Sequence, residues 1–233
     1  MDVYRLLGFD ADAIGGVIPS PREILRQHVD RPDPVIFDVG ASVGQSVERF
    51  RALFERPVIH AFEPDGAAFK ELHQRFGGLD SVVLNCLALG DSTGTATLRR
   101  NNFHETSSLL PLDASSPWAQ SLDIREAESA LVGIDTIDHY CGERGVATID
   151  LLKIDVQGFE PECLRGAAGM LAAKRIRTIQ LEIILHPLYA RPVRFADVES
   201  LLSPHGYRLF TIFDLAVAST GELLQLDGLF LPA

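Results

Sequence analysis

The sequence predicts an α/β protein built on a doubly wound, mostly parallel β-sheet. From residue 35 onward, short apolar runs alternate with helical patterns, which is typical of a parallel sheet with helices on both faces. Small-residue turns follow several of these runs. The last two runs, residues 207–213 and 223–230, have no helical pattern between them. We therefore expect an antiparallel hairpin at one edge of the sheet.

The chain divides into two parts of unequal size. We expect an N-terminal helical extension over residues 1–30 and a single domain over residues 31–233. Ser20-Pro21-Arg22-Glu23 matches a capping box with proline at the first helical position, which predicts a helix over residues 21–29. Three alternatives stay open for this helix: packing on the sheet, covering a ligand, or joining an oligomer.

The single domain carries the strand–helix alternation. We predict strands over residues 35–39, 58–62, 81–87, 148–154 and 178–185, and helices over residues 45–54, 65–76, 160–168 and 195–202. The turn over residues 90–94 predicts an additional strand over residues 95–100. Residues 101–130 are polar and poorly periodic, so we expect a loop with a short helix there.

The composition excludes several classes of function. Of the 233 residues, 46% are hydrophobic, and the net charge is 21 − 32 = −11. This acidity argues against nonspecific binding to nucleic acid or to an anionic membrane. No apolar run approaches the ~18 residues of a membrane span, and neither a secretory signal nor a CxxC motif is evident. We therefore expect a cytoplasmic protein with a small-molecule substrate.

The turn after the first predicted strand is the most informative segment. It has the pattern D-x-G-x-x-x-G over residues 38–44, and a helix follows directly. Glycines let a backbone approach a ligand closely, and a helix N-terminus offers unpaired N–H groups. We expect this turn to bind a nucleoside-type cofactor through Asp38, Gly40, Ala41, Ser42 and Gly44.

Glu63 ends the second predicted strand and is followed by Pro64. The carboxyl ends of parallel strands meet at one rim, where ligands of such sheets bind. We therefore expect Glu63, Pro64 and Ala88, which follows the third strand, beside the turn. The Glu63 carboxylate is suited to accept hydrogen bonds from both ribose hydroxyls of a nucleoside. The alternative is a solvated carboxylate that caps the next helix.

The spacing of the turn separates two classes of cofactor. The dinucleotide fingerprint is G-x-G-x-x-G, whereas Ser42 stands here in place of the second glycine, which would admit a pyrophosphate. S-adenosylmethionine, which carries no phosphate, fits better. The alternatives are an NAD(P)-dependent oxidoreductase and a noncatalytic cofactor-binding protein of the same fold.

A second motif, IDLLKIDVQGFE, covers residues 149–160. At this point the sequence resembles the FkbM family of class I S-adenosylmethionine-dependent methyltransferases. The matching pieces occur in order between residues 34 and 213: FDVGA (37–41) with Gly44, AFEP (61–64), ALGD (88–91), SSL (107–109), DTID (135–138), LKIDVQGFE (152–160), GA (166–167) and LE (181–182). The family usually has D-x-E-G-x-E, but this chain has Gln157 in place of the first glutamate, which puts any role of that charge in doubt here.

The resemblance implies a Rossmann-like class I methyltransferase domain over residues 31–233. It also implies O-methyl transfer to a hydroxyl of a sugar, glycan or natural product. By the same resemblance, Asp38, Gly40, Ser42 and Gly44 hold the methionine part of the cofactor, Glu63 holds the ribose, and residues near Ala88 hold the adenine. Asp155 would face the reacting end.

Three side chains are candidates for the general base. Asp155 is the first candidate, and its alternative is a helix N-cap that also helps to hold the cofactor. His186, just after the strand over residues 178–185, is the second, and His104 is the third. Asp155 and Glu182 are also candidate ligands of Mg²⁺, against the alternative that Glu182 only caps a loop or binds an arginine. The sequence leaves open whether the chain forms a homo-oligomer.

Overall fold

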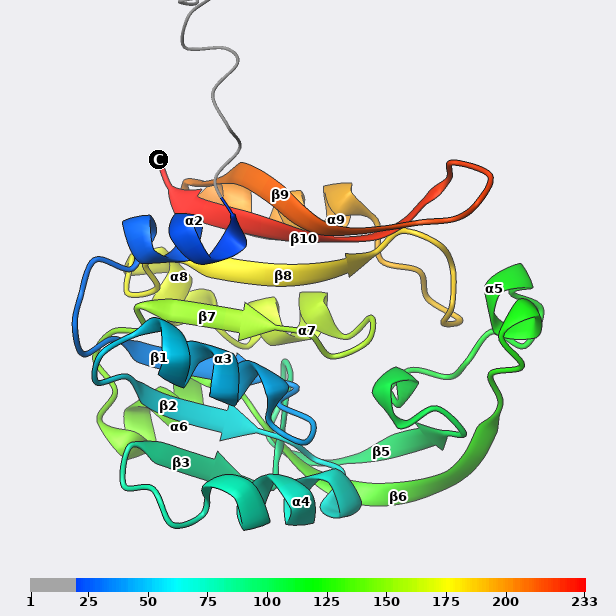
Figure 1. The fold of residues 1–233 in the computed structure, drawn as a ribbon, viewed down its shortest axis with the longest axis horizontal. Coiled ribbons are helices and arrows are strands. Elements are labelled where there is room, and N and C mark those ends of the chain that lie inside the picture. Colours follow the sequence, from blue (N-terminus) through cyan, green and yellow to red (C-terminus); the bar gives the residue numbers. More distant parts are fainter. Residues whose placement is uncertain (1–19) are drawn as a thin grey trace, which may run out of the picture.

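The computed structural model describes residues 20–233, which form a seven-stranded sheet covered by helices (Figure 1). The strand order is β3-β2-β1-β7-β8-β10-β9. The bounds are β1 Val35–Val39, β2 Val58–Phe62, β3 Val82–Asn85, β7 Leu151–Ile154, β8 Ile179–Ile184, β9 Tyr207–Val217 and β10 Leu223–Pro232. The strands from β3 to β8 pair in parallel, whereas β10 pairs antiparallel with β8 and with β9. The predicted fold class and its edge hairpin are therefore confirmed.

Neighbouring side chains of each strand enter two different apolar layers. Ile36 belongs to one layer and Phe37 to the other, as the alternation of a strand requires. The first layer contains helices α2 (Pro21–His28), α3 (Gln45–Leu53) and α4 (Gly66–Phe76), and the second contains α6 (Ile137–Arg144), α7 (Glu160–Arg165), α8 (Ala168–Ala172) and α9 (Phe195–Leu202). With both faces covered, the rim at the carboxyl ends of the strands is left to form a site.

The capping box predicted at the start of α2 is present. The Glu23 N–H donates to Ser20 Oγ at 3.3 Å, and the Ser20 N–H donates to Glu23 Oε2 at 2.7 Å. Ile24 and Leu25 are buried in the apolar layer that also contains α3. Of the three alternatives for this helix, packing on the sheet is the one observed. The part of the predicted extension before Ser20 lies outside the described residues.

A second, three-stranded sheet corrects the expectation for residues 101–130. It consists of β4 (Ala88–Leu89), β6 (Glu126–Asp135) and β5 (Gly94–Asn101), in that order. The extra strand over residues 95–100 is confirmed, but residues 126–130 are strand rather than loop. Residues 126–129 are exposed and Ala130 is half-buried, so no alternation marks them, and pairing with β5 holds them in place. The segment between contains η1 (His104–Thr106) and the expected short helix, α5 (Pro117–Ser121).

Two helices differ from the prediction. The helix expected over residues 160–168 is divided into α7 and α8 near Gly166, where a Cβ would overlap the carbonyl oxygen of Gly90. Helix α6 was not predicted, because histidine, cysteine and glycine in its sequence are weak helix formers. Its N-cap, Thr136, accepts a hydrogen bond from the His139 N–H. In residues 20–233, every helix is too short or too polar to cross a membrane.

Candidate functional site

A cavity of about 530 Å³ lies at the carboxyl ends of the parallel strands. Its wall comes from the turns after β1, β2, β3 and β7, from helix α3, and from the segment that follows β5. This volume is typical of a small-molecule site. The expected cofactor-binding residues that line it are Gly40, Ala41, Ser42, Glu63, Pro64, Ala88 and Asp155. Asp38 and Gly44 are not part of the wall.

The Glu63 carboxylate is anchored in the wall by two backbone N–H groups. The Ser42 N–H donates to Oε2 and the Asp65 N–H donates to Oε1, both at 2.8 Å. Burial raises the pKa of Glu63 to about 7, although the two hydrogen bonds lower it. Each oxygen has a second lone pair for a ligand hydroxyl. The alternative of a helix cap is wrong, because Asp65 caps α4 by accepting from the Ala67 N–H at 2.9 Å.

The two glycines of the turn are required by packing. A Cβ on Gly40 would overlap the Asp155 carbonyl oxygen, and a Cβ on Gly44 would overlap the Phe76 ring. Both have positive φ, +79° and +94°, which favours glycine. Gly40 still presents its backbone to the cavity, but Gly44 does not line it. The contact of Gly44 with a cofactor stays a prediction, and in the structure this glycine lets α3 pack on α4.

Asp38 lies behind the cavity wall. Its side chain is fully buried, accepts a hydrogen bond from Ser46 Oγ, and has Oδ1 3.3 Å from Lys153 Nζ. The direct contact of Asp38 with a cofactor stays a prediction as well. Asp38 instead ties the turn after β1 to α3 and to β7.

Lys153, on β7, is the main group that the sequence analysis missed. Its Nζ lies 3.3 Å from Asp38 Oδ1 and 3.2 Å from Asp155 Oδ2, and it donates to Gly40 O at 3.1 Å. Burial lowers the pKa of Lys153, but the two carboxylates outweigh burial and the net pKa is raised, so the ammonium stays charged. The available signal was a lysine inside an apolar strand, because a buried charge requires partners.

Asp155 and Glu182 meet at the rim through Gln157. Gln157 Nε2 donates to Asp155 Oδ1 at 3.1 Å and to Glu182 Oε2 at 2.6 Å. Burial raises the pKa of Asp155, but Lys153 and the hydrogen bonds lower it below its usual value. Burial and the Asp155 charge raise the pKa of Glu182 well above its usual value. These shifts favour the ionised form of Asp155 and the protonated form of Glu182. Asp155 does not cap α7, whose N-cap is Phe159.

The donor set does not fit the Mg²⁺ ion considered above. Mg²⁺ binds ionised carboxylates and is repelled by a neighbouring ammonium group. Asp155 faces the Lys153 ammonium and the Gln157 amide, and Glu182 accepts from Gln157 and from Gln225 Nε2 at 2.5 Å. Between residues 20 and 233, no group of three or more histidine, cysteine, aspartate or glutamate side chains is arranged to hold a metal ion.

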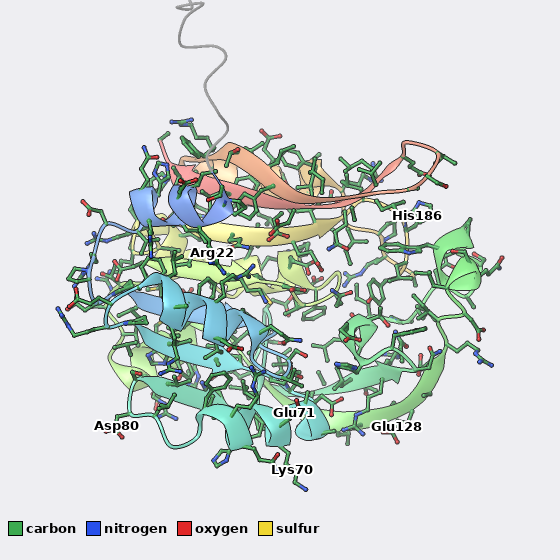
Figure 2. The ribbon with its side chains drawn as sticks, in the orientation of Figure 1. Arg22, Lys70, Glu71, Asp80, Glu128 and His186 are labelled. Atoms are coloured by element: carbon green, nitrogen blue, oxygen red, sulfur yellow. The ribbon has the colours of Figure 1, made fainter. Side chains whose placement is uncertain are left out.

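The two histidine candidates lie in different places. His186 does not line the cavity; its Nδ1 is 3.2 Å from Glu222 Oε1, and its ring is 6.0 Å from that of Trp118. Figure 2 shows it near the β9–β10 hairpin and α5. The catalytic role expected for His186 stays a prediction. His104 does line the cavity, with Nε2 3.2 Å from Glu105 Oε1.

The segment after β5 closes one side of the cavity. Ser107 and Ser108 line it, and Ser108 Oγ donates to Gln157 O at 2.8 Å. Tyr189 Oη donates to Thr106 O at 2.7 Å. Through these two contacts the small sheet is joined to the turns after β7 and β8, so both sheets contribute to one site.

Glu160 holds the turn that carries Asp155 and Gln157. Its Oε1 accepts from the Val156 N–H at 3.0 Å and from the Gly158 N–H at 3.1 Å. The side chain is 1% exposed, and burial raises its pKa to about 7. The early glutamate of the second motif therefore acts on the backbone of the turn.

Known proteins resemble this chain over most of its length. Residues 38–209 match the family model described as the methyltransferase FkbM domain. The 2-O-methyltransferase NoeI of Sinorhizobium fredii is 30% identical over 177 residues, which cover 68% of this chain and 70% of that protein. The 31-O-demethyl-FK506 methyltransferase FkbM of Streptomyces tacrolimicus is 29% identical over 235 aligned residues, which cover 86% of this chain and 83% of that protein.

Among solved structures, the Methanococcus jannaschii fibrillarin pre-rRNA processing protein superposes with a TM-score of 0.50 and 14% identity. The match covers 95% of this chain and 72% of that one. At this identity the likeness is one of fold.

Proposed function

The chain belongs to the FkbM methyltransferase family, and from this premise we propose that it is an S-adenosylmethionine-dependent O-methyltransferase. We propose a hydroxyl of a sugar, glycan or natural product as the acceptor. The fold is that of a class I methyltransferase.

One observation carries the proposal: the order of chemical groups along the rim. From β3 to β7 the cavity wall presents apolar Ala88, the Glu63 carboxylate, the backbone of Gly40, and the Asp155 carboxylate. An apolar wall suits an adenine ring, and an anchored carboxylate suits a ribose diol. The order of the groups thus matches a nucleoside whose reactive end points toward Asp155.

S-adenosylmethionine supplies, when bound, a methyl group that the sulfonium sulfur already activates. The protein has to hold the acceptor oxygen in line with the S–CH₃ bond and to exclude water. Positioning of this kind contributes ~7–11 kcal/mol to lowering the barrier. The closed wall formed by Ser107 and Ser108 serves both purposes.

We assign Asp155 to accept the proton of the acceptor hydroxyl. Its carboxylate is ionised beside Lys153, and Gln157 orients it. A weak base is sufficient, because the acceptor oxygen becomes strongly acidic as it gains the methyl group. Proton transfer by a positioned side chain contributes about 10²–10⁴-fold.

The names of two relatives support oxygen as the accepting atom. One is a 2-O-methyltransferase, and the other is a 31-O-demethyl-FK506 methyltransferase. The acidity of this chain, with a net charge of −11, favours a small molecule or glycan over nucleic acid.

The test is transfer of a labelled methyl group from S-adenosylmethionine to a panel of hydroxylated sugars and natural products. We expect label in at least one acceptor, together with S-adenosylhomocysteine. For Asp155→Asn we expect kcat to fall by about 10²–10⁴-fold while the Kd for S-adenosylhomocysteine changes little. Binding of NADH without binding of S-adenosylhomocysteine, measured by fluorescence and calorimetry, would contradict the proposal.

A further inference from the structure

Arg49, on helix α3, lines the cavity. Its guanidinium group has no role in the function proposed above. Its Nε is buried and has no hydrogen-bond partner within residues 20–233. The neighbouring carboxylate on the same helix, Glu48, lies 2.7 Å from Arg75 NH2 instead. A buried donor of a cationic group that lacks a partner costs free energy, so a ligand atom that accepts from Arg49 would remove that cost.

The other charged groups of the wall already have partners. Lys153 is paired with two carboxylates, and Asp65 is bound in a bidentate manner by Arg100 at 2.9 and 3.1 Å. The Glu63 carboxylate is held by two N–H groups, and His104 lies next to Glu105. Within residues 20–233, Arg49 is therefore the cationic group of the wall that lacks an anionic partner. An anionic group of the ligand would supply one.

The place of Arg49 in the fold indicates which part of a ligand it meets. Helix α3 begins directly after the turn that follows β1, and Gln45 and Arg49, four residues apart on one helix face, both line the cavity. The proposed adenine and ribose positions lie at β3 and β2, on one side of that turn. The amino-acid end of the cofactor would then extend from the turn toward α3.

We propose that Arg49 binds the carboxylate at the amino-acid end of S-adenosylmethionine; this inference rests on the proposed function. A guanidinium presents two parallel N–H donors that match a carboxylate. Arg49 is thus a cofactor-binding residue, and it distinguishes a nucleoside with an amino-acid tail from one without. A carboxylate on the acceptor is the other source of the same chemistry, and the experiment separates the two.

The experiment is calorimetry with two ligands, S-adenosylhomocysteine and 5′-methylthioadenosine, which lacks the amino-acid carboxylate and amine. For Arg49→Met we expect the Kd of S-adenosylhomocysteine to rise by about 10- to 100-fold, the usual cost of losing hydrogen bonds between charged groups. The Kd of 5′-methylthioadenosine should stay within about twofold, which also shows that the variant is folded. Arg51→Met, which changes an exposed arginine of the same helix, is the matched control and should leave both values unchanged.

Each other outcome overturns the inference in a recognisable way. If Arg49→Met binds S-adenosylhomocysteine as the wild type does, Arg49 does not bind the cofactor carboxylate, and the proposed function stands. If only the KM of an acidic acceptor rises, the carboxylate belongs to the acceptor. If both ligands lose affinity equally, the residue supports the cavity as a whole. If the wild type binds neither ligand, the proposed function itself fails.

Discussion

Replacement of Glu63 by glutamine tests the ribose site, because it changes one carboxylate that the fold has already oriented. In the wild type, Oε1 and Oε2 accept from the Asp65 and Ser42 N–H groups. In Glu63→Gln the amide NH₂ faces one of these N–H donors, and one acceptor for a ribose hydroxyl is lost. Loss of a hydrogen bond to a charged group costs ~1.5–3 kcal/mol. We therefore expect the Kd for S-adenosylhomocysteine to rise about 10- to 100-fold at pH 8.

The pH dependence makes this prediction sharper. Burial raises the pKa of Glu63 to about 7, and a ribose diol donates to the ionised form, so the ligand selects the ionised enzyme. With a pKa near 7 the wild type should bind about tenfold more weakly at pH 6 than at pH 8. The glutamine of Glu63→Gln does not titrate between pH 6 and pH 8, so the Kd of the variant does not depend on this ionisation. The ratio of the variant Kd to the wild-type Kd should therefore fall by about tenfold between pH 8 and pH 6.

Calorimetry of both proteins between pH 6 and pH 8 measures this ratio, in which titration of the ligand itself cancels. Glu71→Gln, on the exposed side of α4 (Figure 2), is the control and should behave as the wild type. A ratio that stays constant over this pH range would refute the ionisation argument. A variant that binds as tightly as the wild type at pH 8 would refute the ribose contact.

Three further substitutions test the scaffold of the site. Lys153→Met leaves the buried carboxylate of Asp38 without its cation, so the free energy of unfolding, measured in urea, should fall by ~3–5 kcal/mol. A decrease below about 1 kcal/mol, which is typical of a surface ion pair, would contradict the buried ion pair. Gly40→Ala places a Cβ against the carbonyl oxygen at the end of β7, and we expect a Tm several degrees lower, whereas the control Gly66→Ala, with open space around the added Cβ, should not lower it. Because the folded pKa of Glu160 is raised to about 7, its contribution to stability is present below about pH 4.5 and is lost as the pH rises through 7. The unfolding free energy of Glu160→Gln relative to wild type should thus increase by ~1–3 kcal/mol from pH 5 to pH 8, and an unchanged difference would count against the buried, neutral carboxyl.

Strands that are buried on both faces could be predicted from the sequence, because burial requires a run of apolar residues. Residues 35–37 are an apolar run because helices cover both faces of the sheet, and Glu63 could be placed at the rim because it follows such a run. Strand β6 was missed for the opposite reason: its first residues are exposed, and pairing with β5, rather than a side-chain pattern, keeps them extended.

The interior of the site was harder to predict because its partners are distant in the sequence. Lys153 pairs with Asp38, 115 residues away. Gly40 and Gly44 are two glycines of the same turn, but their surroundings differ. Gly40 lies against the end of β7, and Gly44 lies against α4. His186 follows a strand of the large sheet, which favoured it as a rim residue, but the course of the chain after β5 brings His104 into the wall instead.

We propose that the cavity at the carboxyl ends of β3, β2, β1 and β7 holds S-adenosylmethionine. A crystal structure of the chain with S-adenosylhomocysteine tests it most directly. We predict the ribose hydroxyls within hydrogen-bond distance of both Glu63 oxygens and the adenine against Ala88. A structure in which the nucleoside binds elsewhere, or leaves this cavity empty, would contradict the claim.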